Sequence, residues 1–420
     1  MYDLNRCFSL LEKLSFNRLA GTKDEEKAIS ILKEEIEKEG LVPQVEGFEI
    51  DAPYIVKASL KVLEPYEKEY TVTGVGMSGS TLKQGIDKEL VYIENVLDVN
   101  LVDVEDKIVL INGRMINKFY KEIVKSKAAG FISFSGSVYD KEEDSDLLIR
   151  TIREKDYELG KIPGVNLRAL DAEELVRNGA KKVNLTLIQE ERKAVAHNVI
   201  CEIKGTKLPS EVIVVSAHYD SVEFSSGAYD NASGTVGIME LLHHFKENPP
   251  SRTLRFIWCG AEEKGLLGSK NYCLVHKEEL ASVVFNLNID MIGVVLGREI
   301  AVCTSEMSLV NYITYLGREI GIAVNSSQGV YSSDSTPFAD SGIPSVSFAR
   351  ISPSGGCEIH SRRDKIDFMS KEAFASSLTL IQTFLDRMVN AYLFPVKKII
   401  PDNMKEEIDY YYFRKERPLK

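Results

Sequence analysis

The chain has 420 residues, of which 44% are hydrophobic and 27% charged, a composition typical of a globular protein with more than one domain. Its 52 basic and 63 acidic side chains give a formal net charge of −11, which argues against nucleic acid or an anionic membrane as the main partner. Because no apolar run approaches the ~20 residues of a membrane span and the N-terminus lacks the pattern of a secretory signal, we expect a cytoplasmic protein.

Two helices are predicted at the N-terminus. Apolar residues recur at helical spacing from Asp3 to about Phe16 and again from Ala28 to Ile36. The sequence Arg18-Leu19-Ala20-Gly21-Thr22 separates them, and Thr22 or Asp24 could cap the second helix. The polar face of this second helix is rich in Glu and Lys, which is typical of a solvated surface helix.

The segment 48–192 has a different character. It contains many short alternating or apolar runs separated by polar turns, with two helical stretches at about Phe119 to Ala128 and Ala169 to Val176. The first His of the whole chain is His197, so this segment offers few candidate catalytic groups. We expect it to fold as an inserted, mixed β-rich domain.

Strands and helices alternate from about His197 to Phe394. The expected strands are His197–Ile200, Val212–Val215, Leu254–Cys259, Val283–Ile289 and Ser345–Phe348, with helices between and after them. This alternation predicts an α/β fold with a mostly parallel central sheet flanked by helices. With the N-terminal helices it makes a discontinuous domain of residues 1–47 and 193–394, followed by a charged, aromatic tail, 395–420, that either packs on the core or frays.

One strand–loop–helix unit carries the first candidate metal ligands. The apolar run Val212–Val215 is typical of a buried parallel strand and leads to His218. A Gly- and Ser-rich loop then leads to Asp230 and to a helix that ends near Phe245. Ligands bind at the ends of strands in such sheets. We therefore expect His218 and Asp230 to face a common crevice.

Further acidic groups and a second His follow later strands. Glu262 and Glu263 come just after the strand that ends at Cys259, Asp290 ends the next strand, and His360 follows a Gly-rich loop. Adjacent carboxylates repel each other, so placing two at a sheet edge costs stability unless a cation is bound. Two imidazoles and three carboxylates suit zinc, and a bridging carboxylate would let five ligands hold two ions. Glu262 would then be free to act as a general base.

The motifs AHYDSV, GAYDNASG, CGAEEKGLLGS and NIDMIG, together with the later His, resemble those of the di-zinc exopeptidase family that includes aminopeptidase Y, bacterial leucyl aminopeptidases and glutamate carboxypeptidase. The resemblance implies a zinc-exopeptidase (phosphorylase/hydrolase-like) fold with two zinc ions, other divalent metals being possible. It implies five metal ligands: His218, Asp230, Glu263, Asp290 and His360. It also implies that Asp230 bridges the ions, that Glu262 is the general base, and that Asp220 orients the His218 ring.

The segment 48–192 carries a resemblance of its own. Its sequences KIVLINGR, KAAGFISFSG and IPGVNLRALDAEELVRNG resemble the protease-associated (PA) domain that is inserted in many members of the same family. The resemblance implies a PA-like domain inserted between the two parts of the peptidase domain.

The leading functional hypothesis is a metallo-aminopeptidase that removes N-terminal residues from peptides through a zinc-bridged water activated by Glu262. The motif GAYDNASG favours the aminopeptidase branch of the family. Three alternatives stay open: a carboxypeptidase or dipeptidase, a glutaminyl cyclase of the same fold, and a catalytically inactive binding protein. Peptides are the expected partners, and a homo-oligomer is possible.

The chain departs from the family at two places near the expected site. The residue before the late His is often a Tyr that can hydrogen-bond the tetrahedral intermediate, whereas here it is Ile359. The family's Arg-Ser-Asp-His-type loop appears as Ser332–Phe338, without the Arg or the His. Tyr331 or Tyr229 could supply the missing phenol. A substrate carboxylate could be contacted by Arg350, Arg362 or Arg363, for which surface ion pairs are the alternative.

Overall fold

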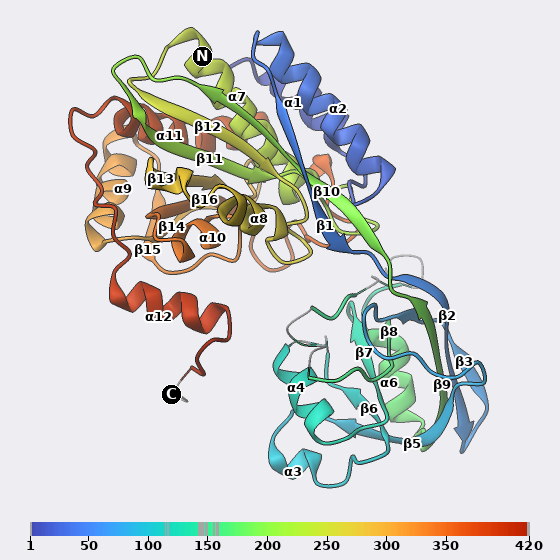
Figure 1. Cartoon of the computed structure of the whole chain (residues 1–420). Helices are drawn as coiled ribbons and strands as arrows, with labels where there is room; N and C mark the ends of the chain where they lie inside the picture. Colours follow the sequence, from blue (N-terminus) through green and yellow to red (C-terminus); the bar gives the residue numbers. More distant parts are fainter. Residues whose placement is uncertain are drawn as a thin grey trace. The chain divides into compact units, whose positions relative to one another are not determined.

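The structure is a computed structural model of the chain, and it describes residues 2–113, 115, 117–141, 147, 150–153, 156 and 159–417. The chain forms two compact units (Figure 1). Unit 1 comprises Met1–Glu49 and Val195–Lys420, and unit 2 comprises Ile50–Ala194. The last three residues of the expected C-terminal tail, 418–420, lie outside the described residues.

Unit 1 is built around an eight-stranded sheet in the order β1-β10-β12-β11-β13-β16-β14-β15. Its strands are β1 (Gln44–Asp51), β10 (Lys193–Ile203), β11 (Leu208–His218), β12 (Arg252–Cys259), β13 (Val283–Ile289), β14 (Arg298–Thr304), β15 (Val324–Gln328) and β16 (Ser345–Ile351). The four central strands β12, β11, β13 and β16 run parallel, whereas β10 and β14 join them antiparallel. The predicted α/β fold with a mostly parallel central sheet is confirmed.

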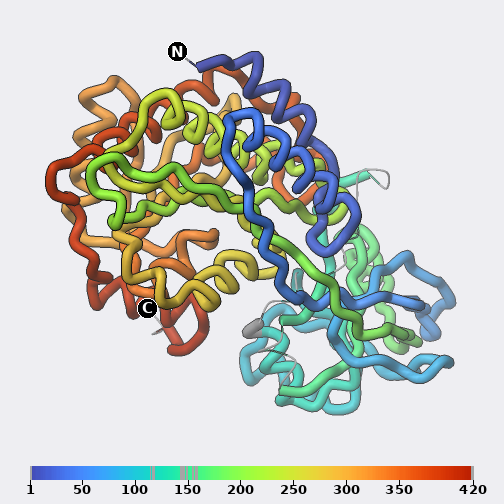
Figure 2. The backbone as a smooth tube through the Cα atoms, turned by 45° about the horizontal axis from the view of Figure 1, so that its top comes forward, coloured from blue at the N-terminus to red at the C-terminus, as the bar shows by residue number. Residues whose placement is uncertain are grey.

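Helices cover both faces of this sheet. The larger core receives side chains from α1 (Leu4–Leu14), α2 (Lys23–Lys38), α7 (Ser233–Glu247), α9 (Met307–Ile320) and α11 (Lys371–Asn390). The smaller core, on the other face, receives side chains from α8 (Leu267–Val275) and α10 (Ser335–Asp340). Figure 2 shows the N-terminal helices, in blue, lying against the yellow-green α7.

The central strand β11 shows why this fold needs a continuous apolar run. Ile213 and Val215 point into the larger core, while Val212 and Val214 point into the smaller one, and none of the four is more than 5% exposed. Successive side chains of a strand face opposite sides, so a strand covered on both faces must be apolar at every position. The same covering leaves only the ends of the strand open to a ligand.

The C-terminal segment packs on unit 1. Helix α12 (Asp402–Tyr411) buries Met404 and Ile408, which together with Ile400 contact Ala339 of α10 and Val330. Of the two outcomes expected for this tail, packing on the core is the one observed over the described residues.

Unit 2 has a second eight-stranded sheet, in the order β3-β2-β9-β5-β6-β7-β8-β4. Its strands are β2 (Tyr54–Glu64), β3 (Lys68–Tyr70), β4 (Thr73–Gly74), β5 (Ile86–Ile93), β6 (Ile108–Ile111), β7 (Gly130–Ser135), β8 (Gly164–Arg168) and β9 (Lys182–Glu190). Strands β5 to β8 are parallel, and the rest pair antiparallel. Its helices are α3 (Asp98–Leu101), α4 (Asn117–Lys125) and α6 (Ala169–Arg177). Its relation to the PA domain stays a prediction.

Over the part of the chain that the structure describes, no helix combines the length and the apolar character needed to cross a membrane.

Candidate metal centre

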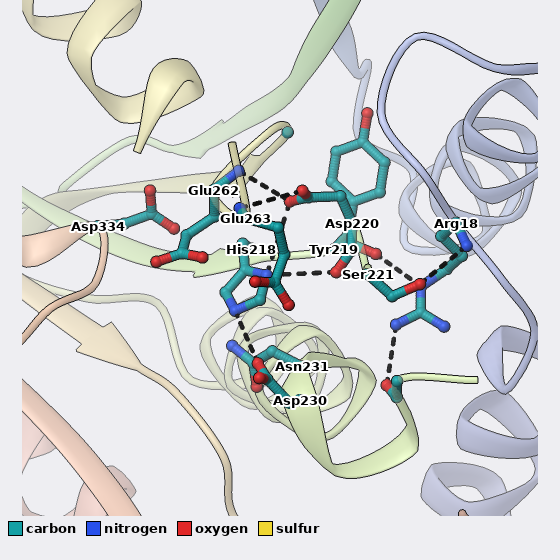
Figure 3. A network of polar contacts seen from close by, with 12 residues as sticks. Arg18, His218, Tyr219, Asp220, Ser221, Asp230, Asn231, Glu262, Glu263 and Asp334 are labelled. Carbon is teal, nitrogen blue, oxygen red and sulfur yellow. Dashed lines mark hydrogen bonds and ion pairs between the residues drawn. The ribbon is translucent and has the colours of Figure 1, made fainter. Parts of the chain in front are cut away.

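The residues that the sequence singled out gather at the carboxyl ends of the parallel strands. His218 is the last residue of β11, Glu263 follows β12 after a short turn, and Asp290 directly follows β13. Asp230 comes from the turn Ala228–Ala232 that precedes α7, and His360 from the loop after β16. Because the carboxyl ends of parallel strands meet at one edge of the sheet, residues far apart in the sequence come together there. Figure 3 shows part of this cluster.

Asp230 lies between two groups of donor atoms. Its Oδ1 is 3.2 Å from His218 Nε2, and its Oδ2 is 3.1 Å from His360 Nε2. His218 Nε2 is also 3.5 Å from Asp290 Oδ1, and His360 Nε2 is 3.0 Å from Glu263 Oε2. Within each of the two groups, the donor atoms all lie within 4.8 Å of one another. The structure thus brings the five expected ligands together as two triplets that share Asp230.

Two buried oxygens in these triplets have no hydrogen-bond partner. They are Glu263 Oε1 and Asp290 Oδ1. A buried carboxylate oxygen without a partner costs free energy, because it has lost its water and gained nothing in return. Imidazole nitrogens and carboxylate oxygens at one place are the donor set that zinc takes in proteins. The residues present therefore fit a bound divalent ion.

Opposite charges shift the pKa values of these side chains. Burial lowers the pKa of His360, but the charge of Glu263 and hydrogen bonds to Asp230 and Glu263 raise it to about 11. Burial raises the pKa of Glu263 to about 7, and the charge of Asp230 acts in the same direction. Burial also acts to raise the pKa of Asp230, but hydrogen bonds from His218 and His360 hold it below the usual range. Here imidazolium protons balance the carboxylates, so we expect metal binding to release protons.

Asp220 connects the first metal ligand with the Glu262–Glu263 turn. Its carboxylate oxygens accept hydrogen bonds from the backbone N–H groups of Glu262, at 3.0 Å, and Glu263, at 3.3 Å. Asp220 Oδ1 is also 3.6 Å from His218 Nδ1. The ring nitrogen Nδ1 thus faces Asp220, while Nε2 faces the donor cluster. The backbone carbonyl oxygen of Asp220 lies 3.3 Å from Nδ1, within hydrogen-bond distance, and this contact, with the carboxylate nearby, orients the imidazole.

The Glu262 carboxylate belongs to neither triplet and lies on the side of the site where another buried acid, Asp334, is found (Figure 3). Burial raises the pKa of Glu262 well above its usual range, and the charges of Glu263 and Asp334 add to this effect against the opposing charge of His218. Asp334 Oδ1 accepts a hydrogen bond from Ser269 Oγ at 2.5 Å, whereas its buried Oδ2 has no partner. Burial raises the pKa of Asp334 to about 6.

Two further residues hold the backbone of the site, and sequence reasoning did not identify their role. Asp364 accepts hydrogen bonds from the N–H groups of Tyr229, at 2.8 Å, and Asp230, at 3.0 Å. Asn231 donates to the carbonyl oxygen of Ile289 at 2.9 Å and accepts from the N–H of Met291 at 3.0 Å. Asn231 therefore forms hydrogen bonds with the backbone on both sides of Asp290. Asn231 lies in the motif GAYDNASG, but nothing in the motif names its partners.

Residues 198–385 match the sequence profile of Peptidase family M28. Aminopeptidase YwaD of Bacillus subtilis (strain 168) is 30% identical over 382 residues, which cover 87% of this chain and 79% of that protein. The chain belongs to peptidase family M28. The metallopeptidase class predicted from the sequence motifs is thereby confirmed.

Other relatives agree with this assignment. Carboxypeptidase Q of Homo sapiens is 28% identical over 289 residues, which cover 63% of this chain and 59% of that protein. The solved structure of BSAP, a zinc aminopeptidase from Bacillus subtilis, matches with a TM-score of 0.77 and 25% identity over 96% of this chain and 99% of that one. A zinc-containing relative and a donor set that fits zinc both support the zinc predicted from the motifs.

The structure separates the two tyrosines that could replace the phenol missing at Ile359. The hydroxyl of Tyr229 donates to the carbonyl oxygen of Arg350 at 2.6 Å and accepts from the N–H of Ser352 at 3.2 Å. It therefore holds the backbone at the end of β16. Tyr331 is partly buried, and burial together with the charges of Asp290 and Asp230 raises its pKa well above the usual value. Because the Tyr229 hydroxyl is engaged in this way, Tyr331 is the better candidate of the two.

Arg350 does not act as the expected contact for a substrate carboxylate. Its guanidinium lies 3.0 Å from the buried Glu299 and donates to the carbonyl oxygen of Val294 at 2.7 Å. Its hydrogen-bonding capacity is used inside the protein because Glu299, on β14, needs a cationic partner when it is buried.

Proposed function

We propose that this M28 peptidase is an aminopeptidase that holds two zinc ions, one in each donor triplet. The observation that carries the number of ions is the orientation of Asp230, which directs Oδ1 toward His218 and Oδ2 toward His360. A carboxylate with one oxygen in each of two donor groups is suited to bridge two ions. Each ion would have three protein ligands and an open position, as catalytic zinc requires.

Glu262 is the general base in this proposal. Zinc, when bound, lowers the pKa of water and polarises a carbonyl group. The Glu262 carboxylate belongs to neither triplet, while its backbone N–H is held by Asp220. It is therefore free to take a proton from the attacking water and to pass it to the leaving amine. Bound cations would lower the raised pKa of Glu262, since they stabilise its charged form.

Tyr331 is the group that we propose for stabilising the oxyanion. Its side chain is close enough to Asp290, Asp230 and Glu262 for their charges to raise its pKa. A phenol kept in its protonated form donates a hydrogen bond to an oxygen that gains negative charge. Ile359, which packs against the larger core, cannot supply this donor.

The charge of the site favours a substrate with a free amino terminus. Seven carboxyl groups lie in or beside the two triplets: Asp220, Asp230, Glu262, Glu263, Asp290, Asp334 and Asp364. One fully buried cation, Arg18, lies near these acids, whose charges act to raise its pKa against the effect of burial. A site rich in carboxylates attracts the ammonium group of a peptide and repels its carboxylate. The names of the relatives YwaD and BSAP, both aminopeptidases, point in the same direction.

A carboxypeptidase or dipeptidase is the second candidate, because carboxypeptidase Q is among the relatives. This function needs a cation for the substrate carboxylate. Of the three arginines considered for that contact, Arg350 is paired with Glu299 and Arg363 with Glu358.

The deciding experiment compares short peptides that are unblocked, N-acetylated or C-amidated, on protein of measured zinc content. We expect cleavage of the unblocked and amidated peptides only, at about two zinc ions per chain. Glu262→Gln should keep its zinc and lose about 10²- to 10⁴-fold in kcat, whereas the neighbouring Glu263→Gln should lose zinc. Cleavage of acetylated but not amidated peptides would establish the carboxypeptidase instead. Full activity with a single zinc ion would contradict the two-ion site.

A further inference from the structure

We propose that Arg18 is a positioning residue for the metal site, because it closes the loop that joins His218 to Asp230. This inference rests on the proposed function, in which both of these residues are zinc ligands. Arg18 belongs to the Arg-Leu-Ala-Gly-Thr sequence between α1 and α2, outside the residues 198–385 that match the family profile. A residue about two hundred positions before the first ligand would thus determine the distance between two ligands.

The Arg18 guanidinium ties the two ends of this loop together (Figure 3). It is fully buried, and its Nε donates to the carbonyl oxygen of Tyr219 at 2.6 Å. Its Nη1 donates to the carbonyl oxygen of Ser226 at 2.6 Å, and its Nη2 to that of Gly227 at 2.9 Å. Tyr219 adjoins His218, and Gly227 begins the turn that carries Asp230. One planar group therefore sets how far apart the two ends of the loop lie.

The same side chain anchors the loop to the N-terminal helices. Nη1 also lies within hydrogen-bond distance of the carbonyl oxygens of Leu14 and Phe16, at the end of α1, so its two N–H groups are shared among three acceptors. Carbonyl groups at a helix C-terminus have no partner within the helix and carry a partial negative charge, so a buried cation stabilises them. The backbone N–H of Arg18 donates to Ser221 Oγ at 3.0 Å, and Asn17 Nδ2 donates to the carbonyl oxygen of Val222 at 2.9 Å. Both ends and the middle of the loop are held.

The loop is shaped around a guanidinium. Gly227 has a positive φ of 55°, and a Cβ atom at this position would lie 2.7 Å from the carbonyl oxygen of Asp230 and from Ser221 Cβ, and 2.8 Å from Arg18 Nη2. Gly227 thus leaves room for the loop and for the guanidinium beside it. Lysine cannot replace Arg18 here, because an ammonium group has three donors on one atom and cannot reach carbonyl groups on several sides at once.

The charge of Arg18 also suits its place beside the acids. Burial lowers its pKa to about 10, while the charges of Asp364, Asp220, Asp230 and Glu263 act in the opposite direction. The group thus remains charged at neutral pH. A fixed positive charge behind the ligands reduces their mutual repulsion and keeps them in place for zinc.

The test compares Arg18→Lys with the matched control Arg252→Lys. Arg252 is equally buried and donates to Glu211 and to the carbonyl oxygens of Val389 and Ala391, but it lies at the start of β12, the end away from Glu262. Zinc affinity is measured by competition with a chromogenic chelator, ligand geometry by the visible spectrum of the Co²⁺-substituted protein, and stability by thermal unfolding of the metal-depleted protein.

We expect Arg18→Lys to weaken zinc binding about 10- to 100-fold, to change the Co²⁺ spectrum, and to lower kcat with KM within about twofold. Arg252→Lys should lower the unfolding temperature and leave zinc affinity and the spectrum as in the wild type. Wild-type zinc affinity and spectrum in Arg18→Lys would overturn the inference, as would equal losses in both variants.

A milder variant covers the case in which Arg18→Lys does not fold. Asn17→Ala releases the carbonyl oxygen of Val222 and the backbone N–H of Leu19, and it should weaken zinc binding by a few fold, whereas unchanged zinc affinity would overturn the inference. The wild type separates this question from the proposed function. If wild-type protein binds no zinc, the proposed function fails; if it binds zinc and the variants bind it equally well, only the role of Arg18 fails.

Discussion

Replacing Gly234 with Ala should disturb the contacts by which Asn231 holds the backbone around Asp290, one of the proposed zinc ligands. Gly234 lies in the first turn of α7, where a Cβ atom would be 2.4 Å from Asn231 Oδ1 and 2.5 Å from the carbonyl oxygen of Ile289. Neither oxygen can yield easily. Asn231 is fully buried and hydrogen-bonded, and Ile289 is part of the central strand β13.

The cost follows from the contacts that must give way. If Asn231 moves, it loses its hydrogen bonds with Met291 and Ile289, worth about 1 kcal/mol each. Overpacking of a close-packed region adds about 2 kcal/mol. The higher helix propensity of Ala returns about 1 kcal/mol. We therefore expect Gly234→Ala to lower the free energy of unfolding by about 3 kcal/mol and to weaken zinc binding about tenfold or more.

Gly237, one turn further along α7, is the matched control. A Cβ atom there would meet the tips of flexible side chains, with Ile292 Cδ1 at 3.0 Å and Ile289 Cδ1 at 3.6 Å. Gly237→Ala should therefore stay within about 1 kcal/mol of the wild type. Urea denaturation with and without zinc, together with chelator competition, measures both effects. If Gly234→Ala matches the wild type in unfolding free energy and zinc affinity, the described role of Asn231 is wrong.

Three further predictions concern the rest of unit 1. Removing metal with a chelator should lower the unfolding temperature, and added zinc should restore it. A bound ion stabilises the folded state by about 3 to 4 kcal/mol when free zinc is at 100 to 1,000 times its Kd. An unchanged unfolding temperature would contradict the metal centre. Burial lowers the pKa of His276, but hydrogen bonds to Glu279 and Glu46 raise it above its ordinary value. Its stabilising effect is therefore complete below about pH 6.5 and is lost as the pH rises through the raised pKa. The destabilisation caused by His276→Gln should accordingly shrink as the pH rises above about 6.5 rather than stay constant. Ile408→Ala should lower the free energy of unfolding, measured by urea denaturation, by about 2 to 4 kcal/mol, because Ile408 is only 3% exposed in the contact between α12 and α10. An unchanged urea midpoint would show that this contact adds no stability.

The elements that the sequence identified are those with an extended apolar pattern. Strand β13 spans Val283–Ile289, as expected from its apolar run, and helices lie between and after the expected strands. Elements without such a pattern were missed. Strand β15 has the sequence VNSSQ and lies at the edge of the sheet, where only pairing with β14 makes it a strand. Helix α10 has only six residues, too few to show a helical period.

By itself, the sequence determined the family, the central sheet and the set of side chains from which a metal site can be built, because motif order and apolar runs are local features of the chain. Only the tertiary structure decided how these side chains meet. Asp230 turns one oxygen toward each His, Asn231 holds the backbone around Asp290, and Arg18 closes the ligand loop across some two hundred residues. Such contacts depend on where distant segments come together on the folded sheet, and no periodicity or spacing along the chain records that meeting point.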